Sequence, residues 1–251
     1  MILEEILKTT EARVSQIEVK PDHDPGYRSC RLSDAIRGAV GKNAVIAELK
    51  YASPSEGSFS PRKGPELMAA ELIMAGCIGL SVLTEPHFFG GSTEMLKKVR
   101  RVAPVPILRK DFIIDERQVF ETRALGADAI LLIAKILGDR LPSFVDLSRS
   151  VGLEPLVEVH TPGEVDLALV SGATLCGINN RDLGTMKIDI NTTRRLSPHL
   201  RSGGCLVVSM SGIRGPSDIR YLKKYGDAFL IGSAIMQSDK PKLLLEEFVC
   251  A

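Results

Sequence analysis

The sequence predicts an α/β protein that folds as a (β/α)8 barrel, the TIM-barrel architecture, with a helical N-terminal extension. Eight short apolar runs follow residue 43, and segments with helical spacing of apolar residues separate them. Most runs lack the polar alternation of a half-exposed antiparallel strand, so they are typical of parallel strands covered on both faces. Eight such units within about 210 residues, with no obvious edge strand, favour a closed barrel over a long open sheet. A chain of 251 residues has the usual length of one such domain, so residues 1–251 are expected to form a single domain.

The first 43 residues differ from the rest and are expected to form the extension, with the barrel following over residues 44–251. Apolar residues recur there at broadly helical spacing among charges: Ile2, Ile6, Val14 and Ile17. A polar stretch, PDHDPGY at 21–27, interrupts this helix. Ser33 and Asp34 are expected to cap a second, short helix over 35–40.

The barrel elements can be assigned individually. The predicted strands are AVIAEL (44–49), IGLSVL (78–83), VPIL (105–108), AILLIA (129–134), LEPLVEV (153–159), TLCGIN (174–179), CLVVSM (205–210) and AFLIG (228–232). Helices are expected to begin near Pro65, Ser92, Asp115, Pro162 and Pro216, because these residue types suit an N-cap or the first helical turn.

Composition excludes several classes of function. Lys and Arg number 32 against 31 Asp and Glu, so the chain lacks the basic excess of a general nucleic-acid-binding protein. No stretch approaches the roughly 20 apolar residues of a membrane span, and the N-terminus carries acidic residues where a signal peptide would be basic. The cysteines are odd in number and without close pairs: Cys30, Cys77, Cys176, Cys205 and Cys250. We expect free thiols and a cytoplasmic protein.

Charged residues gather at the predicted strand ends, where barrels of this kind place their active sites. Glu48 and Lys50 alternate at the end of the first strand, so both side chains should point the same way. Lys110 follows the third strand, and Glu158 lies within the fifth. A lone charge there is ordinarily a solvated loop residue, but several charges that point into a barrel need partners or a ligand. These residues therefore predict a catalytic site.

A phosphate site is predicted after the last two strands. Ser211-Gly212 follows the seventh strand and Gly232-Ser233 the eighth, which is where barrels often hold a phosphate. Glycine allows backbone N–H groups to approach an anion, and a short helix is expected to begin at Ser233. Tight turns alone could explain one such pair, but two pairs on adjacent strands favour a phosphorylated small molecule as ligand.

An apolar wall and the absence of a metal site complete the prediction. Phe89, Phe112, Leu131 and Leu183 lie near strand ends and could face an apolar part of the ligand, although ordinary barrel packing is an equal alternative. The four histidines are scattered, and the sequence contains no His, Cys and Asp cluster with ligand spacing, so we expect no metal.

Seven segments together resemble one enzyme family. They are AELKYASPSEG (47–57), SVLTEPHFFGGS (81–92), LRKDFI (108–113), ADAILLIAKIL (127–137), LVEVH (156–160), GINNRDL (177–183) and IGSAIM (231–236). In this order, and with the helical extension, they resemble indole-3-glycerol-phosphate synthase of tryptophan biosynthesis over nearly the whole chain. The resemblance implies ring closure, decarboxylation and dehydration of 1-(2-carboxyphenylamino)-1-deoxyribulose 5-phosphate, without a cofactor or metal.

The resemblance also implies roles for individual residues. Lys110 matches the general acid of ring closure, and Lys50 matches a second lysine that contacts substrate anions. Glu48 matches the carboxylate that orients the lysines, and Glu158 matches the general base or acid of the dehydration. Asn179 matches a residue that positions the substrate.

Three further positions bear on the resemblance. Arg181 matches a residue near the substrate carboxylate, and Ser53 lies in a motif that shapes the mouth. After the seventh strand the family usually has Glu-Ser-Gly, whereas this chain has Met210 before Ser211. Methionine carries no charge and accepts only weak hydrogen bonds, so altered rate or substrate contacts are expected.

Two alternatives remain at this point. One is a non-catalytic barrel that binds a phosphate ligand, because the glutamate is lost at Met210. The other is a barrel similar to phosphoribosylanthranilate isomerase, although Glu48, Lys50, Lys110 and Glu158 together are not expected there. Either a monomer or a weak homodimer is compatible with the sequence.

Overall fold

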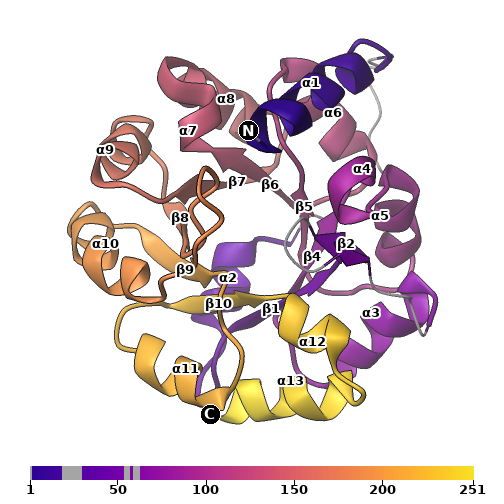
Figure 1. Cartoon of the computed structure of the whole chain (residues 1–251), viewed down its shortest axis with the longest axis vertical. Coiled ribbons are helices and arrows are strands. Elements are labelled where there is room, and N and C mark those ends of the chain that lie inside the picture. Colours follow the sequence, from indigo (N-terminus) through magenta and orange to yellow (C-terminus); the bar gives the residue numbers. More distant parts are fainter. Residues whose placement is uncertain (1, 19–29, 54–56, 59–62) are drawn as a thin grey trace.

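Eight parallel strands close into a barrel in the computed structural model, which describes residues 2–18, 30–53, 57–58 and 63–251 (Figure 1). In chain order the barrel strands are β1 (Val45–Leu49), β4 (Gly79–Leu83), β5 (Ile107–Lys110), β6 (Ala129–Ile133), β7 (Glu154–Val159), β8 (Leu175–Asn179), β9 (Leu206–Met210) and β10 (Ala228–Ile231). β1 pairs with β4 on one side and with β10 on the other, which closes the sheet. The predicted (β/α)8 barrel with an N-terminal helix is confirmed.

Helices surround the barrel, and a small hairpin follows β1. The helices are α1 (Ile2–Val14), α2 (Leu32–Arg37), α3 (Pro65–Met74), α4 (Pro86–Phe89), α5 (Thr93–Arg100), α6 (Glu116–Ala124), α7 (Ala134–Leu137), η1 (Gly138–Arg140), α8 (Leu141–Ser150), α9 (Pro162–Val170), α10 (Asn191–Ser202), α11 (Pro216–Leu222), α12 (Ser233–Gln237) and α13 (Pro241–Cys250). The hairpin pairs β2 (Ala52–Ser53) with β3 (Gly57–Ser58).

The predicted helix starts at five positions are confirmed. Ser92 caps α5 by accepting the Met95 N–H at 3.0 Å, and Asp115 forms a capping box with Gln118 at the start of α6. Thr161 caps α9, while α3 and α11 begin at their prolines.

Two boundary predictions are wrong. β5 covers Ile107–Lys110 rather than 105–108, so the charged pair Arg109-Lys110 belongs to the strand and not to the loop. Arg109 is fully buried and is tolerated there because carboxylates and hydroxyls surround its guanidinium. The second short helix begins at Leu32, with Arg31 as an N-cap that makes no side-chain hydrogen bond, so Ser33 and Asp34 lie inside it. The predicted polar break at 21–27 lies outside the described residues.

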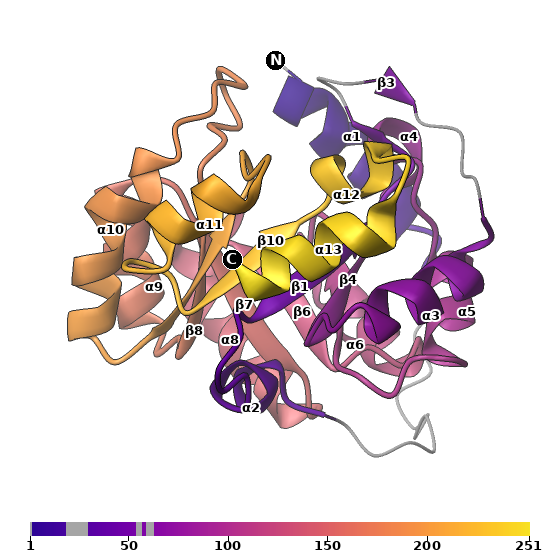
Figure 2. The same ribbon diagram turned by 90° about the horizontal axis from the view of Figure 1, so that it is seen from below.

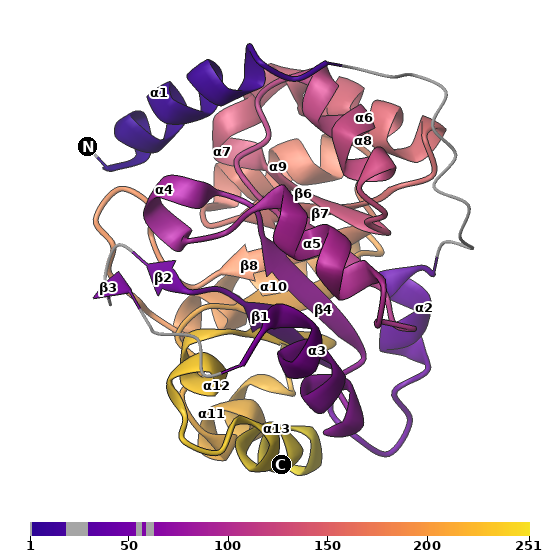
Figure 3. The same cartoon turned by 90° about the vertical axis from the view of Figure 1, so that its right-hand side faces the viewer.

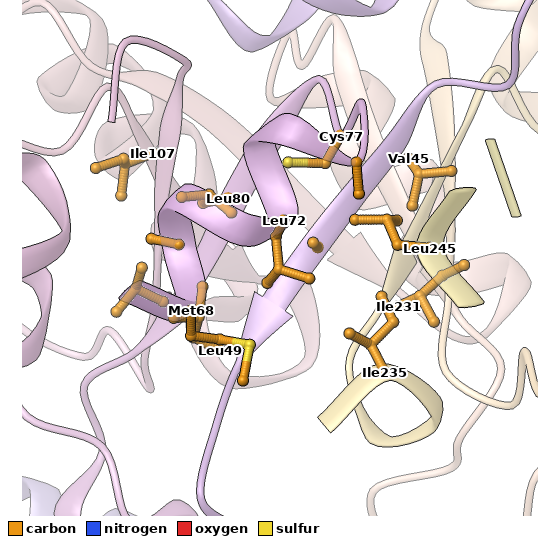
Figure 4. Packing of buried hydrophobic residues seen from close by; sticks show 14 of the residues in the cluster. Val45, Leu49, Met68, Leu72, Cys77, Leu80, Ile107, Ile231, Ile235 and Leu245 are labelled. Atoms are coloured by element: carbon orange, nitrogen blue, oxygen red, sulfur yellow. The ribbon is translucent and has the colours of Figure 1, made fainter. Parts of the chain in front are cut away.

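Side chains alternate along each strand between the barrel interior and the helical layer. Ile46, Leu108, Leu131, Leu156 and Leu230 pack in one buried interior cluster. The alternate residues of the strands pack against the surrounding helices; Figure 4 shows one such region, where Val45, Leu49, Leu72, Ile231 and Leu245 are among the labelled side chains. Because the period of a strand is two, Glu48 and Lys50 share the inward face with Ile46.

The two helices of the extension lie at opposite ends of the barrel (Figures 2 and 3). α2 covers the amino ends of the strands, where the Ser33 N–H donates to Glu154 of β7 at 3.0 Å. α1 lies at the other end, near α4. Of the helices that the structure describes, none is long and apolar enough to cross a membrane.

Candidate active site

One pocket at the C-terminal ends of the strands brings the predicted site residues together. The predicted residues that line it are Glu48, Lys50, Phe89, Lys110, Phe112, Leu131, Glu158, Asn179, Arg181, Leu183, Ser211, Gly212, Gly232 and Ser233. Ser53 forms part of β2, directly after β1, and its side chain lies outside the described part of the structure. The pocket thus brings together the predicted site residues other than Ser53, while the role of each residue stays a prediction.

Glu48 and Lys50 form an ion pair on the β1 side of the pocket. The Lys50 Nζ lies 3.4 Å from the Glu48 Oε1, and both side chains are largely buried. Gly232, at the end of β10, lies against this pair so closely that a Cβ atom there would overlap the Glu48 carboxylate. Glycine at position 232 thus leaves the space in which Glu48 can reach Lys50.

Lys110, Glu158 and Asn179 form a second polar group across the pocket. The Asn179 side-chain amide donates to Glu158 Oε1 at 2.9 Å, while its oxygen accepts the Arg181 N–H at 3.0 Å. The other carboxylate oxygen, Glu158 Oε2, lies 3.9 Å from the Lys110 Nζ and has no hydrogen-bond partner among the described residues. A buried carboxylate with one oxygen left open is suited to exchange a proton or a hydrogen bond with a ligand.

The apolar wall includes residues that the sequence analysis missed. Phe89 and Phe112 contact each other with ring centroids 5.9 Å apart, next to Leu131 and Leu183. Ile2, Leu3 and Ile6 of α1 line the same pocket. Their helical spacing was visible in the sequence, but only the fold shows that this stripe faces the mouth rather than the outside of the barrel.

The loop after β8 is fixed by Asp182. This carboxylate accepts the Gly184 and Thr185 N–H groups at 2.7 and 2.8 Å and pairs with the His160 Nε2 at 3.3 Å. The Thr185 N–H leads the interactions that lower the pKa of Asp182 below its ordinary value. His160 also bonds to the Asn179 carbonyl at 2.6 Å, so it supports the loop that carries Arg181 and Leu183.

The predicted phosphate edge has unusual backbone geometry. Ser211 and Gly212 both have positive φ, 68° and 82°, and Ser211 is one of two non-glycine residues with positive φ in the described part of the chain. Such a conformation is disfavoured for a side chain other than glycine and is concentrated at functional sites. α12 begins directly after Gly232, so its first N–H groups lie at the same edge of the pocket.

Met210 lies at the end of β9 in the pocket, where it is 1% exposed. In the parallel register it pairs with Asn179. Its thioether packs against Gly177, where a Cβ atom would overlap the methionine methyl group. An apolar side chain therefore fills a position between polar neighbours. Among the described residues, no three His, Cys, Asp or Glu side chains are grouped so that they could hold a metal ion.

The fold and the pocket together define the class of protein: a (β/α)8-barrel enzyme whose mouth combines paired ammonium and carboxylate groups with an apolar wall. The sequence profile described as "Indole-3-glycerol phosphate synthase" matches residues 3–248. The chain belongs to the indole-3-glycerol phosphate synthase family.

Individual relatives agree with this assignment. The indole-3-glycerol phosphate synthase of Thermoanaerobacter sp. (strain X514) is 40% identical over 249 residues, covering 94% of this chain and 93% of the relative. That of Aquifex aeolicus is 45% identical over 208 residues, covering 82% and 80%. A solved tryptophan synthase from M. tuberculosis superposes with a TM-score of 0.65 at 13% identity, covering 88% of this chain and 98% of that one, and shows the fold alone.

Proposed function

We propose that the protein catalyses the formation of indole-3-glycerol phosphate from 1-(2-carboxyphenylamino)-1-deoxyribulose 5-phosphate. An aromatic carbon attacks the ketone carbon to close the five-membered ring, the carboxylate leaves as carbon dioxide, and the new hydroxyl leaves as water. The observation that carries this proposal is the single pocket in which two lysines, two carboxylates and an apolar wall meet, in a chain that belongs to this family.

Lys110 is proposed as the general acid of ring closure. It would protonate the ketone oxygen while the new carbon–carbon bond forms, because an ammonium group in the pocket can both stabilise and neutralise the developing oxyanion. Its neighbour Glu158, at 3.9 Å, is close enough to orient the ammonium group without a tight ion pair that would have to break. This looseness supports a proton donor rather than a purely structural lysine.

Glu158 is proposed to transfer protons during dehydration, and Asn179 to position it. The open oxygen Oε2 can take up the proton that is lost as the pyrrole double bond forms, while Oε1 is held by Asn179. A fixed amide donor restricts the carboxylate to one orientation, which favours proton transfer along one path.

Substrate anions are proposed to bind on two sides. Lys50, oriented by Glu48, and Arg181 would contact the negative groups of the substrate. Ser53, in β2 directly after β1, is proposed to help shape the mouth. Ser211, Gly212, Gly232 and Ser233 would bind the phosphate through backbone N–H groups and the Ser hydroxyls. Phe89, Phe112, Leu131 and Leu183 would contact the aromatic ring, because these side chains form the apolar part of the pocket.

The proposal also covers the cellular compartment, the oligomeric state and the binding partner of the protein. We propose that the protein works in the cytoplasm as a monomer or weak homodimer, and that its partner is the small phosphorylated substrate. The near balance of acidic and basic residues supports a small, local anion site rather than a nucleic-acid surface.

Purified protein and the carboxyphenylamino substrate provide the test, with indole fluorescence as the readout. Formation of a fluorescent indole with release of carbon dioxide is the expected result. Binding of the substrate without product would instead identify a non-catalytic phosphate-binding barrel. Turnover of phosphoribosylanthranilate without indole formation would identify an isomerase.

A further inference from the structure

His160 follows β7 at the mouth of the barrel, and its ring lies between two oxygen acceptors. Its Nδ1 lies 2.6 Å from the carbonyl oxygen of Asn179, and its Nε2 lies 3.3 Å from Asp182 Oδ2. The backbone of His160 is held separately, because its N–H donates to Glu164 Oε2 at 2.7 Å in the first turn of α9. The ring therefore joins the end of β8 to the loop that follows it.

The first contact of the ring restricts the peptide group between Asn179 and Asn180. His160 bonds to its carbonyl oxygen from the β7 side, while its N–H donates to the Met210 carbonyl of β9 at 2.8 Å. A peptide group is planar, so bonds at both of its polar atoms restrict the direction in which the Asn179 side chain leaves the backbone. That side chain donates to Glu158 Oε1 at 2.9 Å. His160 thus acts on Glu158 through Asn179.

The second contact of the ring acts on the loop after β8. The Asp182 carboxylate accepts two backbone N–H groups of this loop at 2.7 and 2.8 Å, so it is fixed relative to the turn. Its neighbours in the chain, Arg181 and Leu183, both line the pocket. The contact between His160 and Asp182 therefore holds two side chains that are proposed to contact the substrate, and it does so independently of Glu158.

The two contacts differ in the proton that each requires. A carbonyl oxygen only accepts hydrogen bonds, so Nδ1 carries a proton whether the ring is neutral or charged. Nε2 faces a carboxylate oxygen, so this contact is attractive only when Nε2 is protonated as well and the ring is a cation. The Thr185 N–H leads the interactions that lower the pKa of Asp182, so this carboxylate stays ionised while a histidine titrates.

Charged groups from four parts of the fold line a small cavity beside this ring. Among the described residues they are Glu158 of β7, Glu164 of α9, Asp182 of the loop after β8 and Lys135 of α7. Three carboxylates and one ammonium group leave a negative balance, which a protonated His160 offsets. The charged ring is thus the form that makes both contacts.

We propose that His160 is a positioning residue with two separable contacts: the one with Asn179 orients the proposed proton carrier, and the one with Asp182 holds the substrate-binding loop. The kinetic consequence rests on the proposed function, whereas the state of the ring rests on the geometry alone. Loss of the first contact lowers kcat, because Glu158 is no longer held in one orientation. Loss of the second raises KM, so KM increases with pH as Nε2 loses its proton.

Two substitutions separate the contacts, because asparagine places an amide nitrogen near the position of Nδ1 and glutamine places one near that of Nε2. For His160→Asn we expect kcat within about twofold of the unaltered protein and KM raised about fivefold at the acidic end of the pH profile. For His160→Gln we expect kcat lowered about tenfold and KM within about twofold. The rise of KM toward alkaline pH should be absent from both variants. The control His199→Asn alters an exposed histidine of α10, whose Nε2 lies 3.5 Å from Asp166, and should keep the rise.

Heteronuclear NMR of the imidazole nitrogens observes the ring directly, with His160→Asn to assign its signals. Nδ1 should stay protonated throughout a pH titration, and only Nε2 should lose its proton. A neutral ring protonated on Nε2, an equal loss of kcat in both variants, or a rise of KM that survives in both would overturn the inference. If the unaltered protein forms no indole, the proposed function fails, yet the NMR titration still decides whether His160 is held between the two acceptors.

Discussion

The two ends of the barrel use buried carboxylates in opposite ways. At the amino end, Asp128 accepts the Cys30 N–H at 2.9 Å, the Ile107 N–H at 2.8 Å and the Arg100 guanidinium at 2.7 Å. At the mouth, Glu158 has one oxygen bonded to Asn179 and the other open, with Lys110 at 3.9 Å. The first carboxylate is saturated by the protein, whereas the second retains capacity for a ligand.

This difference separates stability from function within one fold. Removing a buried carboxylate whose hydrogen bonds are all made by the protein lowers the free energy of unfolding strongly, because several donors and a guanidinium lose their partner. An open carboxylate is costly to maintain, and the fold gains little from it. Substitutions at the two ends should therefore affect different measurements.

Lys110→Met gives the largest expected effect. We predict that kcat/KM falls about 10³-fold, because the proposed proton donor is lost. The melting temperature should change little, because the Lys110 side chain is partly exposed and lies at a loose 3.9 Å from Glu158. Steady-state kinetics and thermal unfolding check this, with Lys97→Met on the exposed face of α5 as the matched control. If the variant keeps its activity, or if its melting temperature falls markedly, the mouth residues are not specialised for function in the way that we propose.

Asp128→Asn tests the opposite end. We predict that the free energy of unfolding falls by about 3 kcal/mol, because Arg100 loses its buried counter-charge and one donor loses its acceptor. The specific activity of the folded protein should remain within about twofold of the original, as nothing at the mouth changes. Urea unfolding and kinetics on the same preparation measure both quantities. Lost activity with intact stability would mean that the two ends are coupled.

Met210→Glu makes the mouth more like the usual family sequence. We predict a fall in the free energy of unfolding of about 1–3 kcal/mol, because a carboxylate replaces a buried thioether. The value of kcat/KM should rise, since a hydrogen-bond acceptor is restored beside Asn179. Met210→Leu is the control, which keeps the position apolar and should leave both quantities close to the original. Unchanged turnover and affinity in Met210→Glu would show that the position is dispensable here.

Acid unfolding tests the role of Asp111, the buried carboxylate that pairs with Arg13 of α1. The pKa of Asp111 is lowered, so its stabilising contribution is complete above the ordinary carboxyl pKa of 3.8 and is lost as the pH falls through the lower, folded value. Arg13→Met removes the main lowering interaction and should shift the acid midpoint upward by about 0.5 pH unit. Circular dichroism across an acid titration measures this shift. A midpoint equal to that of Lys8→Met, a control at an exposed position of α1, would indicate that Asp111 does not depend on Arg13.

Thiol labelling gives the smallest expected effect. Burial raises the pKa of Cys77 to about 12, so it should not react at pH 8 in the folded protein, whereas the exposed Cys30 and Cys250 should react quickly. Because Cys30 lies at the amino end beside Asp128, its labelling should change kcat/KM by less than about twofold. A thiol-reactive chromophore and kinetics of the labelled protein check this. If labelling at Cys30 inactivated the protein, the amino end of the barrel would not be independent of the active-site mouth.

Much of the fold was predictable because apolar runs and helix caps are local properties. Strand positions and N-caps such as Ser92 and Asp115 follow from neighbouring residues, and the strand ends located Glu48 and Glu158. The third strand lies two residues beyond its predicted place because charged residues such as Arg109 and Lys110 are typical of a loop. Their burial depends on Glu121 and Asp111, which no local pattern reveals.

The contribution of α1 to the pocket could not be predicted for a similar reason. The stripe that includes Ile2 and Ile6 was visible, but its destination depends on the pairing of Arg13 with a residue 98 positions away. Long-range pairs of this kind are properties of the folded chain, not of a window of sequence. The residue types at the strand ends thus predicted the site, whereas only the tertiary structure shows that α1 lines its mouth.

The contact between Gly232 and Glu48 constrains how this protein can change over generations. A side chain at position 232 would displace the carboxylate that pairs with Lys50, so a mutation at the proposed phosphate edge would also disturb the lysine on the first strand. Positions 48 and 232 lie 184 residues apart in the chain, yet a side chain introduced at one would meet the side chain of the other. A side chain at position 232 requires the Glu48 carboxylate to move or to be shortened, so directed-evolution libraries should vary the two positions together.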